Sequence, residues 1–272
     1  MVGGGRGACR AGRLGTIMAV TRITGASSGF GAVFARKLAA QRHNLVLGAR
    51  RKDRREALAA EVSKSHGVSV VVEVADLSAP NAVVKLMKRL AVQKLQITCL
   101  INNAGFGTLG AFAAQDVLRQ TEMINLNCTA LMQLCHAVLP AMKLRKSGGI
   151  LNVSSTAAFQ AGPNMAVYYA TKAFVLSFSE ALHEEVKHEG IKVSCLCPGP
   201  TKTEFFDAAT ASTMKLMLFA GPAGKVVDDG LAALARNQTF TVSGLLNKIL
   251  AQSGRLSPRA ITRGVAMRLN KS

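Results

Sequence analysis

The sequence predicts an α/β fold in which an open parallel sheet is covered by helices on both faces. Three observations support this prediction. Short apolar stretches alternate with longer helix-compatible stretches along most of the chain. A glycine-rich turn follows the first apolar stretch, and 272 residues with 49% hydrophobic content are enough to bury one sizeable core. We therefore expect a single domain built on a doubly wound, Rossmann-like parallel sheet.

The elements follow one another in the order that this fold requires. Each strand candidate is a run of about six apolar or β-branched residues, as expected for a strand buried on both faces. The expected strands are Val20–Thr24, Asn44–Ala49, Val68–Val74, Ile97–Asn102, Gly149–Ser154 and Lys192–Cys197. The expected helices are Ala32–Arg42, Arg54–His66, Asn81–Leu90, Val117–Leu139 and Tyr168–Glu189.

The turn after the first strand has the composition of a phosphate-binding loop. Gly25, Gly29 and Gly31 are spaced G-x-x-x-G-x-G and lead directly into the first helix. Glycines let the backbone approach a pyrophosphate, and the helix N-terminus supplies N–H donors and partial positive charge. This arrangement favours a dinucleotide site, although a helix-capping glycine turn would look similar.

The end of the second strand indicates which dinucleotide binds. An acidic residue there would contact the ribose 2′-hydroxyl of NAD. Here the strand ends in Ala49-Arg50-Arg51-Lys52, with no acid before Asp53. A basic cluster suits a 2′-phosphate, so we expect NADP (NADPH) in preference to NAD. The alternative is a solvated basic loop.

Tyr168 and Lys172 are four residues apart on a predicted helix and therefore share one face. A free tyrosine has a pKa of about 10, and a cation within roughly 4–6 Å lowers it. The pair thus predicts a tyrosine that exchanges protons at neutral pH. Tyr169 is the only other tyrosine, and it is turned about 100° away from this face.

These motifs together resemble the short-chain dehydrogenase/reductase family over roughly Val20 to Phe206. Their order and spacing carry the resemblance, because each motif alone is short. The matching stretches are Thr24-Gly25-Ala26-Ser27-Ser28-Gly29-Phe30-Gly31, Asp76-Leu77, Asn102-Asn103-Ala104-Gly105, Asn127, Ser155, Tyr168-x-x-x-Lys172 and Pro198-Gly199-Pro200-Thr201.

The resemblance implies an NADP-dependent oxidoreductase that interconverts a ketone or aldehyde and an alcohol by hydride transfer. Tyr168 would be the general acid or base, Ser155 would bind the carbonyl oxygen, and Lys172 would lower the Tyr168 pKa and bind the nicotinamide ribose. Asn127 would position a relay water, in preference to Asn125. Ser155 is preferred to Ser154 because it lies 13 positions before Tyr168.

The resemblance also implies a set of cofactor-binding residues. Asp76 would contact the adenine, Asn102 would help to hold the nucleotide and the sheet, and Thr201 and Thr203 would lie near the carboxamide. The full set is Gly25, Ser27, Ser28, Gly29, Phe30, Gly31, Arg50, Arg51, Asp76, Leu77, Asn103, Ala104, Gly105, Tyr168, Lys172, Pro198, Gly199, Thr201 and Thr203.

The substrate is a small-molecule carbonyl or alcohol compound, expected to be lipophilic. Residues 201–221 would form its lid, and apolar side chains in that stretch, such as Phe205 and Phe206, carry this expectation. The alternatives are a non-catalytic nucleotide-binding protein, or a membrane-surface protein that uses the fold as a scaffold. We expect a homodimer or homotetramer.

Charge and composition limit the kinds of partner that we expect. The net charge is +19, but no aromatic side chains are interleaved with the basic ones and tryptophan is absent, so nucleic acid is not expected. No run approaches the roughly 20 apolar residues of a membrane span. The scattered histidines suggest no metal site. The cysteines are expected to be buried free thiols of a cytoplasmic protein.

The two ends of the chain differ from the central domain (18–244). Residues 1–17 are Gly- and Arg-rich and are expected to be a disordered extension. Residues 245–272 are basic and amphipathic; they would pack on the protein or a dimer mate, or else contact a membrane peripherally.

One residue departs from the pattern of the family. Arg22 interrupts the first strand, where a buried unpaired charge would be costly, so it must reach a partner or the end of the strand. Glu73 poses a milder form of the same problem in the third strand.

Overall fold

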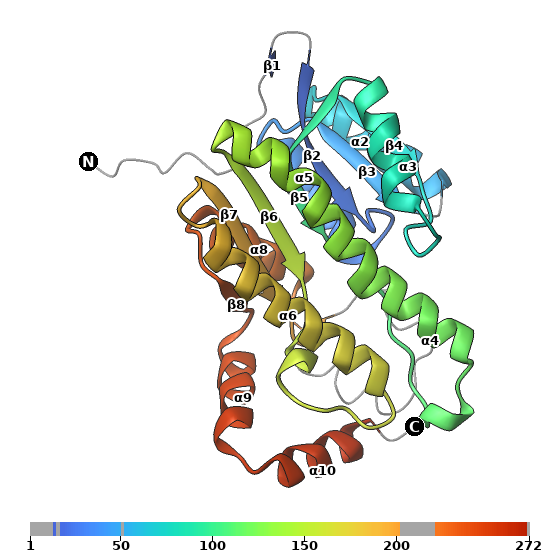
Figure 1. The fold of residues 1–272 in the computed structure, drawn as a ribbon, viewed down its shortest axis with the longest axis vertical. Coiled ribbons are helices and arrows are strands. Elements are labelled where there is room, and N and C mark those ends of the chain that lie inside the picture. Colours follow the sequence, from blue (N-terminus) through green and yellow to red (C-terminus); the bar gives the residue numbers. More distant parts are fainter. Residues whose placement is uncertain (1–12, 15–16, 50–51, 202–220, 271–272) are drawn as a thin grey trace.

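The computed structural model describes residues 13–14, 17–49, 52–201 and 221–270. It confirms the predicted α/β architecture, with one twisted sheet lying between helices (Figure 1). Seven of the described strands run parallel, in the spatial order β4-β3-β2-β5-β6-β7-β8. They are β2 (Ile17–Thr24), β3 (Leu45–Ala49), β4 (Val70–Val74), β5 (Leu95–Asn102), β6 (Gly148–Val153), β7 (Ile191–Cys197) and β8 (Phe240–Val242).

The strand order reverses between β2 and β5. The chain runs outward from β2 through β3 to β4 and then returns to the other side of β2, where β5 begins the second half of the sheet. In open α/β sheets the crevice at the carboxyl ends of the strands on either side of such a reversal is where ligands bind. The fold therefore places the glycine-rich turn after β2 beside the loop after β5.

In the described part of the chain, helices cover both faces of the sheet. Buried apolar side chains of α1 (Gly29–Ala40), α2 (Lys52–His66) and α8 (Ala223–Ala235) form one core. Those of α3 (Ala82–Val92), α5 (Leu131–Arg145) and α6 (Ala166–Val186) form the other. Fully buried side chains such as Phe34 on the first face and Leu86 on the second pack against the strands. This two-sided burial explains why the strands are apolar throughout.

The structure changes several boundaries that the sequence predicts. The expected helix over Val117–Leu139 is α4 (Val117–Ile124), a π-helical segment (Asn125–Ala130) and α5, which continues past Pro140 to Arg145. Helix α8 and strand β8 were not predicted. The C-terminal segment consists of α9 (Leu245–Leu256) and α10 (Arg259–Leu269), which are separated at Pro258 because proline cannot continue the hydrogen-bonding ladder.

Two further expectations concern the N-terminal segment and the cysteines. Strand β1 (Arg13–Leu14) pairs antiparallel with β2, whose first residue is Ile17. Most of residues 1–17 lie outside the described residues, so the expected disordered extension stays a prediction. Cys99 in β5 is disulfide-bonded, whereas Cys128, Cys135, Cys195 and Cys197 are free as expected. Sequence spacing alone gives no information about such pairing.

Candidate active site

The predicted site residues gather at the carboxyl edge of the sheet. Strands β2, β5, β6 and β7 lie side by side and end at Thr24, Asn102, Val153 and Cys197. Because they are parallel, the loops that follow them all emerge at the same edge. This topology brings the glycine-rich turn, the Asn103-Ala104-Gly105 loop, Ser155 and Pro198-Gly199 to one region.

The turn after β2 requires glycine for steric reasons. Gly25 and Gly29 have φ values of +66° and +54°, in the left-handed region that favours glycine. A Cβ atom on Gly31 would lie 2.1 Å from the carbonyl oxygen of Gly25, so only glycine fits there. These glycines let helix α1 begin directly against the end of β2.

The threonine before the turn holds it against the next loop. The Thr24 hydroxyl accepts hydrogen bonds from the backbone N–H groups of Asn103 and Ala104, both at 2.9 Å. The Asn103 amide donates to the carbonyl oxygens of Thr24 and Gly25, at 3.0 and 3.2 Å. The two loops on either side of the strand reversal are therefore fixed relative to each other before any ligand binds.

The turn has the features that a dinucleotide pyrophosphate needs. Ser28 is the N-cap of α1, yet its side chain makes no capping hydrogen bond, and the first turn of the helix holds no acidic residue. The N-terminal N–H groups and the positive end of the helix dipole thus lie at a backbone surface shaped by glycine. Ser27, Ser28, Gly29 and Phe30 are partly exposed here.

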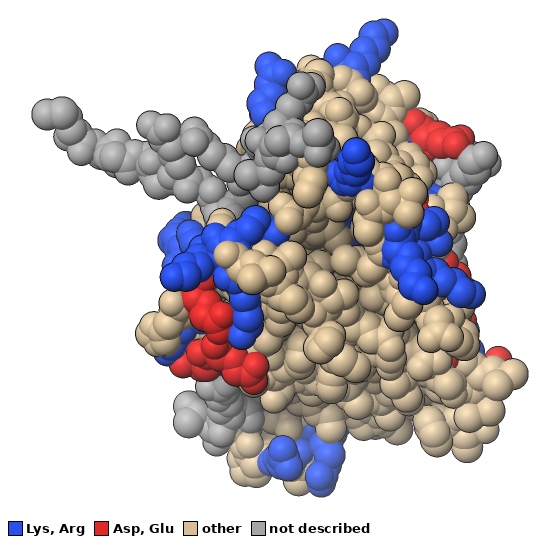
Figure 2. Space-filling model, turned by 45° about the horizontal axis from the view of Figure 1, so that its top comes forward, with Lys and Arg blue, Asp and Glu red and all other residues tan. Residues whose placement is uncertain are grey.

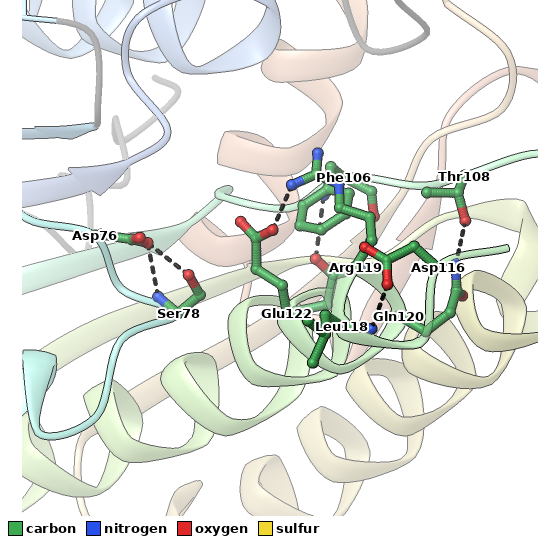
Figure 3. Close-up of polar contacts among 10 residues, drawn as sticks. Asp76, Ser78, Phe106, Thr108, Asp116, Leu118, Arg119, Gln120 and Glu122 are labelled. Carbon is green, nitrogen blue, oxygen red and sulfur yellow. Dashed lines mark hydrogen bonds and ion pairs between the residues drawn. The ribbon is translucent and has the colours of Figure 1, made fainter.

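Asp76 and Leu77 follow strand β4 at the same edge. Asp76 Oδ1 accepts hydrogen bonds from the Ser78 N–H (3.1 Å) and hydroxyl (2.6 Å), which hold the carboxylate in a fixed turn (Figure 3). Asp76 is exposed whereas Leu77 is buried. The carboxylate is therefore accessible at the adenosine end of the predicted site.

Of the remaining residues predicted to bind the cofactor, some lie within the described part of the chain and others lie outside it. Arg50, Arg51 and Thr203 lie outside the described residues, as do Phe205 and Phe206 of the expected lid. Thr201 is described, and its hydroxyl donates to the Gly199 carbonyl at 3.0 Å. The Asn102 amide donates to Asn152 Oδ1 of β6 at 2.9 Å and to Cys135 Sγ of α5 at 3.3 Å, so these contacts join the sheet to α5.

The side chains of Ser155 and Tyr168 lie in contact. The Tyr168 hydroxyl is hydrogen-bonded to the Ser155 side chain. Ser155 is held at the N-cap of a short 3₁₀ helix (Thr156–Phe159), where its Oγ accepts from the Ala157 N–H at 3.1 Å. Ser154, in contrast, donates to the Lys172 carbonyl at 2.7 Å and supports the helix backbone.

Lys172 is buried beside this pair but does not reach the phenol. Its Nζ donates to the Val153 carbonyl at 3.0 Å and lies 5.7 Å from the centroid of the Tyr168 ring. Burial lowers the Lys172 pKa to about 8, an effect partly offset by the nearby thiols of Cys195, Cys128 and Cys197.

The sequence predicts that Lys172 lowers the Tyr168 pKa, and in this structure the shift has the opposite sign. Burial raises the Tyr168 pKa, and the influence that opposes it is the hydrogen bond from Ser155. The physical reason is that the Lys172 ammonium is directed to a strand carbonyl and is itself desolvated. The tyrosine is therefore held in its protonated form.

Asn127 lies next to Lys172, in the π-helical segment between α4 and α5. Its Oδ1 accepts from the Phe106 N–H at 3.1 Å, and its amide donates to the Phe106 carbonyl at 3.0 Å and to Thr171 Oγ1 at 3.1 Å. Both amide hydrogens and the carbonyl oxygen of the side chain are thus engaged by protein groups, which fixes the orientation of Asn127. π-Helical segments inside α-helices are frequent at functional sites.

The surroundings of Tyr168 are apolar. Met123, Ala157 and Met165 form a buried cluster with its ring, and Phe106 and Leu109 pack against that cluster. Arg119 of α4 lies 3.7 Å above the centroid of the Phe106 ring, and Gln120 donates to the Thr108 hydroxyl at 2.9 Å (Figure 3). Helix α4 therefore holds the loop after β5 against the site.

Sequence reasoning missed the contribution of the C-terminal helices. Asn247 of α9 lies against Gly199, where a Cβ atom would be 2.2 Å from Asn247 Nδ2. Asn270, which follows α10, donates to the Pro163 carbonyl at 3.0 Å and to the Tyr169 hydroxyl at 3.4 Å. No local motif marks either residue, because both contacts form only when the chain end folds back.

The described part of the chain contains neither a candidate metal site nor a helix that could cross a membrane. No group of three or more His, Cys, Asp or Glu side chains there could hold a metal ion. None of the helices in the same residues combines the length and the apolar character needed to cross a bilayer.

Comparison with known proteins identifies relatives of this chain. The family model described as short chain dehydrogenase matches residues 19–213. Serine 3-dehydrogenase of Agrobacterium fabrum is 35% identical over 193 residues, which cover 70% of this chain and 74% of that protein.

Two solved structures are similar to this chain in both fold and sequence. A short-chain dehydrogenase from Sphingobium yanoikuyae in complex with NADPH superposes with a TM-score of 0.79 at 35% identity, covering 88% of this chain and 94% of the other. A bulky-bulky ketone specific alcohol dehydrogenase from Comamonas testosteroni has a TM-score of 0.74 at 31% identity, covering 87% and 92%.

Proposed function

Because the chain belongs to the short-chain dehydrogenase family, we propose that it is an NADP-dependent oxidoreductase that interconverts a ketone or aldehyde and an alcohol. The observation that carries this proposal is the hydrogen-bonded pair of Ser155 and Tyr168, with Lys172 buried beside it, at the sheet edge where the glycine-rich turn opens. NADPH, when held at this site, would supply the hydride for the carbonyl carbon.

The protein groups that hold the cofactor divide between its two ends. The N-terminus of α1 and the turn from Gly25 to Gly31 would receive the pyrophosphate. Asp76, Arg50 and Arg51 receive the adenosine end, and the two arginines suit a 2′-phosphate because guanidinium–phosphate hydrogen bonds are charge-assisted. The nicotinamide end lies near Pro198, Gly199 and Thr201. The NADPH complex of the Sphingobium relative supports this choice of cofactor.

Tyr168 and Ser155 act on the substrate oxygen. Ser155 orients the carbonyl oxygen and stabilises the charge that develops on it. Tyr168 donates the proton that converts the oxygen to a hydroxyl group. Because burial raises the Tyr168 pKa, the phenol is protonated at neutral pH, which favours carbonyl reduction.

The apolar cluster around Tyr168 supports a lipophilic substrate. Met123, Met165 and Phe106 offer no polar atoms to hydrated groups, so the part of the substrate next to its carbonyl should be hydrocarbon. The ketone specificity in the name of the Comamonas relative agrees with this substrate class.

A panel of aliphatic and aromatic ketones, followed by NADPH absorbance, tests the proposed activity. Tyr168→Phe removes only the phenolic proton and should lower kcat at least 100-fold while NADPH binding by calorimetry is retained. Tyr169→Phe is the matched control and should keep most of the activity. If no ketone is reduced although NADPH binds, the protein is a non-catalytic nucleotide-binding member. If Tyr169→Phe is the inactive variant, the acid is misassigned.

Exposed apolar side chains support two kinds of partner, a second copy of the chain and a membrane surface. Val117 and Leu118 of α4 and Phe174 of α6 are exposed apolar side chains, which supports a homo-oligomer that buries them. Helices α9 and α10 expose Leu246, Ile249 and other apolar side chains among basic ones, which supports peripheral contact with a membrane.

A further inference from the structure

Arg22 is a fully buried cation without a hydrogen-bond partner. It lies in the middle of β2, between Val46 of β3 and Leu100 of β5. Its exposed fraction is 0%, and its Nε, Nη1 and Nη2 atoms all lack a partner. Burial lowers its pKa to about 10, so it stays charged at neutral pH. A buried guanidinium without a partner is costly, and its presence calls for a reason.

The side chain reaches toward the carboxyl end of β3. A Cβ atom on Gly48 would lie 2.6 Å from Arg22 Nη2, so the guanidinium occupies the space that any other residue at position 48 would fill. Glycine weakens a strand interior, and it is expected where another group approaches the backbone closely. Arg22 and Gly48 therefore form a matched pair, one residue before β3 ends at Ala49.

The carboxylate that attracts Arg22 is that of Glu73, and it already accepts hydrogen bonds from other side chains. Gly48 lies opposite Glu73 in the sheet, and Glu73 attracts Arg22 electrostatically. However, the Glu73 carboxylate accepts hydrogen bonds from Arg89 Nε at 2.8 Å and Gln93 Nε2 at 2.9 Å. Arg55 donates to the Glu73 backbone carbonyl at 2.9 Å. Arg22 therefore makes no hydrogen bond to the Glu73 carboxylate, whose two oxygens accept from Arg89 and Gln93.

We propose that Arg22 is a buried specificity residue for the 2′-phosphate of the dinucleotide. This inference rests on the proposed function, since the end of β3 is where a Rossmann-like fold holds the adenosine ribose. The guanidinium is below the surface, so it acts through its electrostatic field. A charge buried in protein is weakly screened and favours an anion placed above it.

The competing explanation is purely structural. In that case Arg22 holds β2, β3 and β4 together through its attraction to Glu73. Removal of Arg22 would then change the stability of the protein but not its discrimination between nucleotides with and without a 2′-phosphate. A binding experiment that compares two such nucleotides separates the two explanations.

Calorimetric titration with 2′,5′-ADP and 5′-AMP provides this comparison, because the two ligands differ only in the 2′-phosphate. The double variant Arg22→Leu/Gly48→Val replaces the polar pair with an apolar pair that fits a buried strand. It should weaken 2′,5′-ADP binding roughly 10-fold and change 5′-AMP binding less than twofold. Its thermal unfolding midpoint should rise, because an unpaired buried charge has been removed.

Arg145→Leu is the matched control. Arg145 is also partly buried, with an unpartnered Nη1, but it bonds the Ile97 carbonyl near the amino end of β5. Arg145→Leu removes the same charge from the opposite edge of the sheet and should leave 2′,5′-ADP binding unchanged. Arg22→Met, which keeps most of the side-chain volume, is the second variant and should also weaken 2′,5′-ADP selectively.

The outcomes are distinct. The proposal is overturned if variants at position 22 bind 2′,5′-ADP as the wild type does, or if Arg145→Leu loses as much affinity. If the wild-type protein itself binds 2′,5′-ADP no better than 5′-AMP, the preference for NADP fails, and with it the proposed function. Selective loss with the position-22 variants alone supports Arg22 as a specificity residue.

Discussion

At the scale of single residues, burial moves the pKa values of Tyr168 and Lys172 in opposite directions. Both lie inside the protein, and desolvation disfavours the charged form of each. Tyr168 is consequently held as a neutral phenol that can donate a proton. Lys172, with a pKa of about 8, is close to losing its proton at the upper end of the physiological range.

The lowered Lys172 pKa predicts a pH dependence of stability. The folded-state value is about 8 and the ordinary value is 10.5, so between these values the unfolded chain binds more protons than the folded one. Stability contributed by this residue therefore increases as pH rises through 8. Between pH 7 and pH 9 the unfolding free energy of the wild type should rise by about 1.4 kcal/mol relative to Lys172→Met.

Urea titrations at pH 7 and pH 9 measure this difference. Lys64→Met changes an exposed lysine of α2 and serves as the control, with no pH-dependent difference from the wild type expected. An equal pH response of wild type and Lys172→Met would show that Lys172 is not desolvated as the structure indicates.

Residue types, spacing and the family resemblance were sufficient to name Ser155 and Tyr168 as candidate site residues, but not to predict their contact or the electrostatics of the tyrosine. The i, i+4 rule places Lys172 on the same helix face as Tyr168, and the structure agrees. Which group the ammonium contacts depends on Val153 at the end of a different strand. That contact is tertiary, so no local pattern could have shown that burial rather than Lys172 controls the Tyr168 pKa.

At the scale of elements, the junction of β2 and α1 is the most constrained part of the site. Gly25 needs a positive φ, and Gly31 needs the absence of a Cβ atom. Thr24 joins this junction to the loop after β5. The shape of the pyrophosphate site therefore depends on backbone contacts that no side chain can replace.

Gly31→Ala should damage this junction. Its Cβ would meet the Gly25 carbonyl oxygen at 2.1 Å and the Gly25 carbonyl carbon at 2.7 Å, and backbone atoms cannot move aside without opening the turn. We expect a loss of about 2–3 kcal/mol in stability and no increase in the thermal midpoint on addition of NADPH.

Gly224→Ala in α8 is the control for this substitution. No atom lies within 4 Å of a Cβ at that position, so alanine should be neutral or stabilise the helix by about 0.5–1 kcal/mol. The NADPH-induced thermal shift should be that of the wild type. A full NADPH-induced shift in Gly31→Ala would mean that the nucleotide does not bind at this turn.

Elements with strong apolar periodicity could be predicted, and elements defined by tertiary context could not. The strands from β2 to β7 and helices α1 to α3 and α6 agree with the sequence prediction to within a few residues. The π-helical break after Ile124 was missed because the apolar pattern continues through it. Strand β8 was missed because three residues, Phe240–Val242, are too short to show a period.

At the scale of the whole molecule, the charge is unevenly distributed along the chain. Residues 245–272 hold six Lys or Arg residues and no acid, and the last acidic residue of the chain is Asp229. On the face that Figure 2 shows, Lys and Arg form separate groups with wide uncharged surface between them. We therefore expect the protein to bind an anionic partner through its C-terminal helices rather than through a continuous basic face.

The exposed face of α9 and α10 favours a lipid surface over a second copy of the same face. Leu246 and Ile249 of α9 and Ile261 and Val265 of α10 are each at least half exposed. A twofold interface built from this face would bring cations against cations, because residues 245–272 hold no acid to pair with them. An anionic bilayer accommodates both the apolar side chains and the charge.

Co-sedimentation with phosphatidylserine vesicles tests this contact. The wild type should bind at low salt and be released as salt rises, since each cation near the membrane contributes about 1 kcal/mol. Arg263→Ser/Arg268→Ser should therefore weaken binding roughly 30-fold. Lys64→Ser/Lys88→Ser removes the same charge from exposed positions on α2 and α3 and should have little effect.

Leu246→Ser/Ile249→Ser separates the lipid surface from a subunit interface, because it removes apolar area from the same face without changing the charge. If this face meets lipid, the variant should lose vesicle binding and keep the oligomeric state of the wild type by light scattering. Conversion of an oligomer to a monomer, with vesicle binding absent in the wild type, would show that the face is covered by another subunit. Equal loss of binding in the α2–α3 control would show that only net charge, and not these two helices, attracts the protein to the membrane.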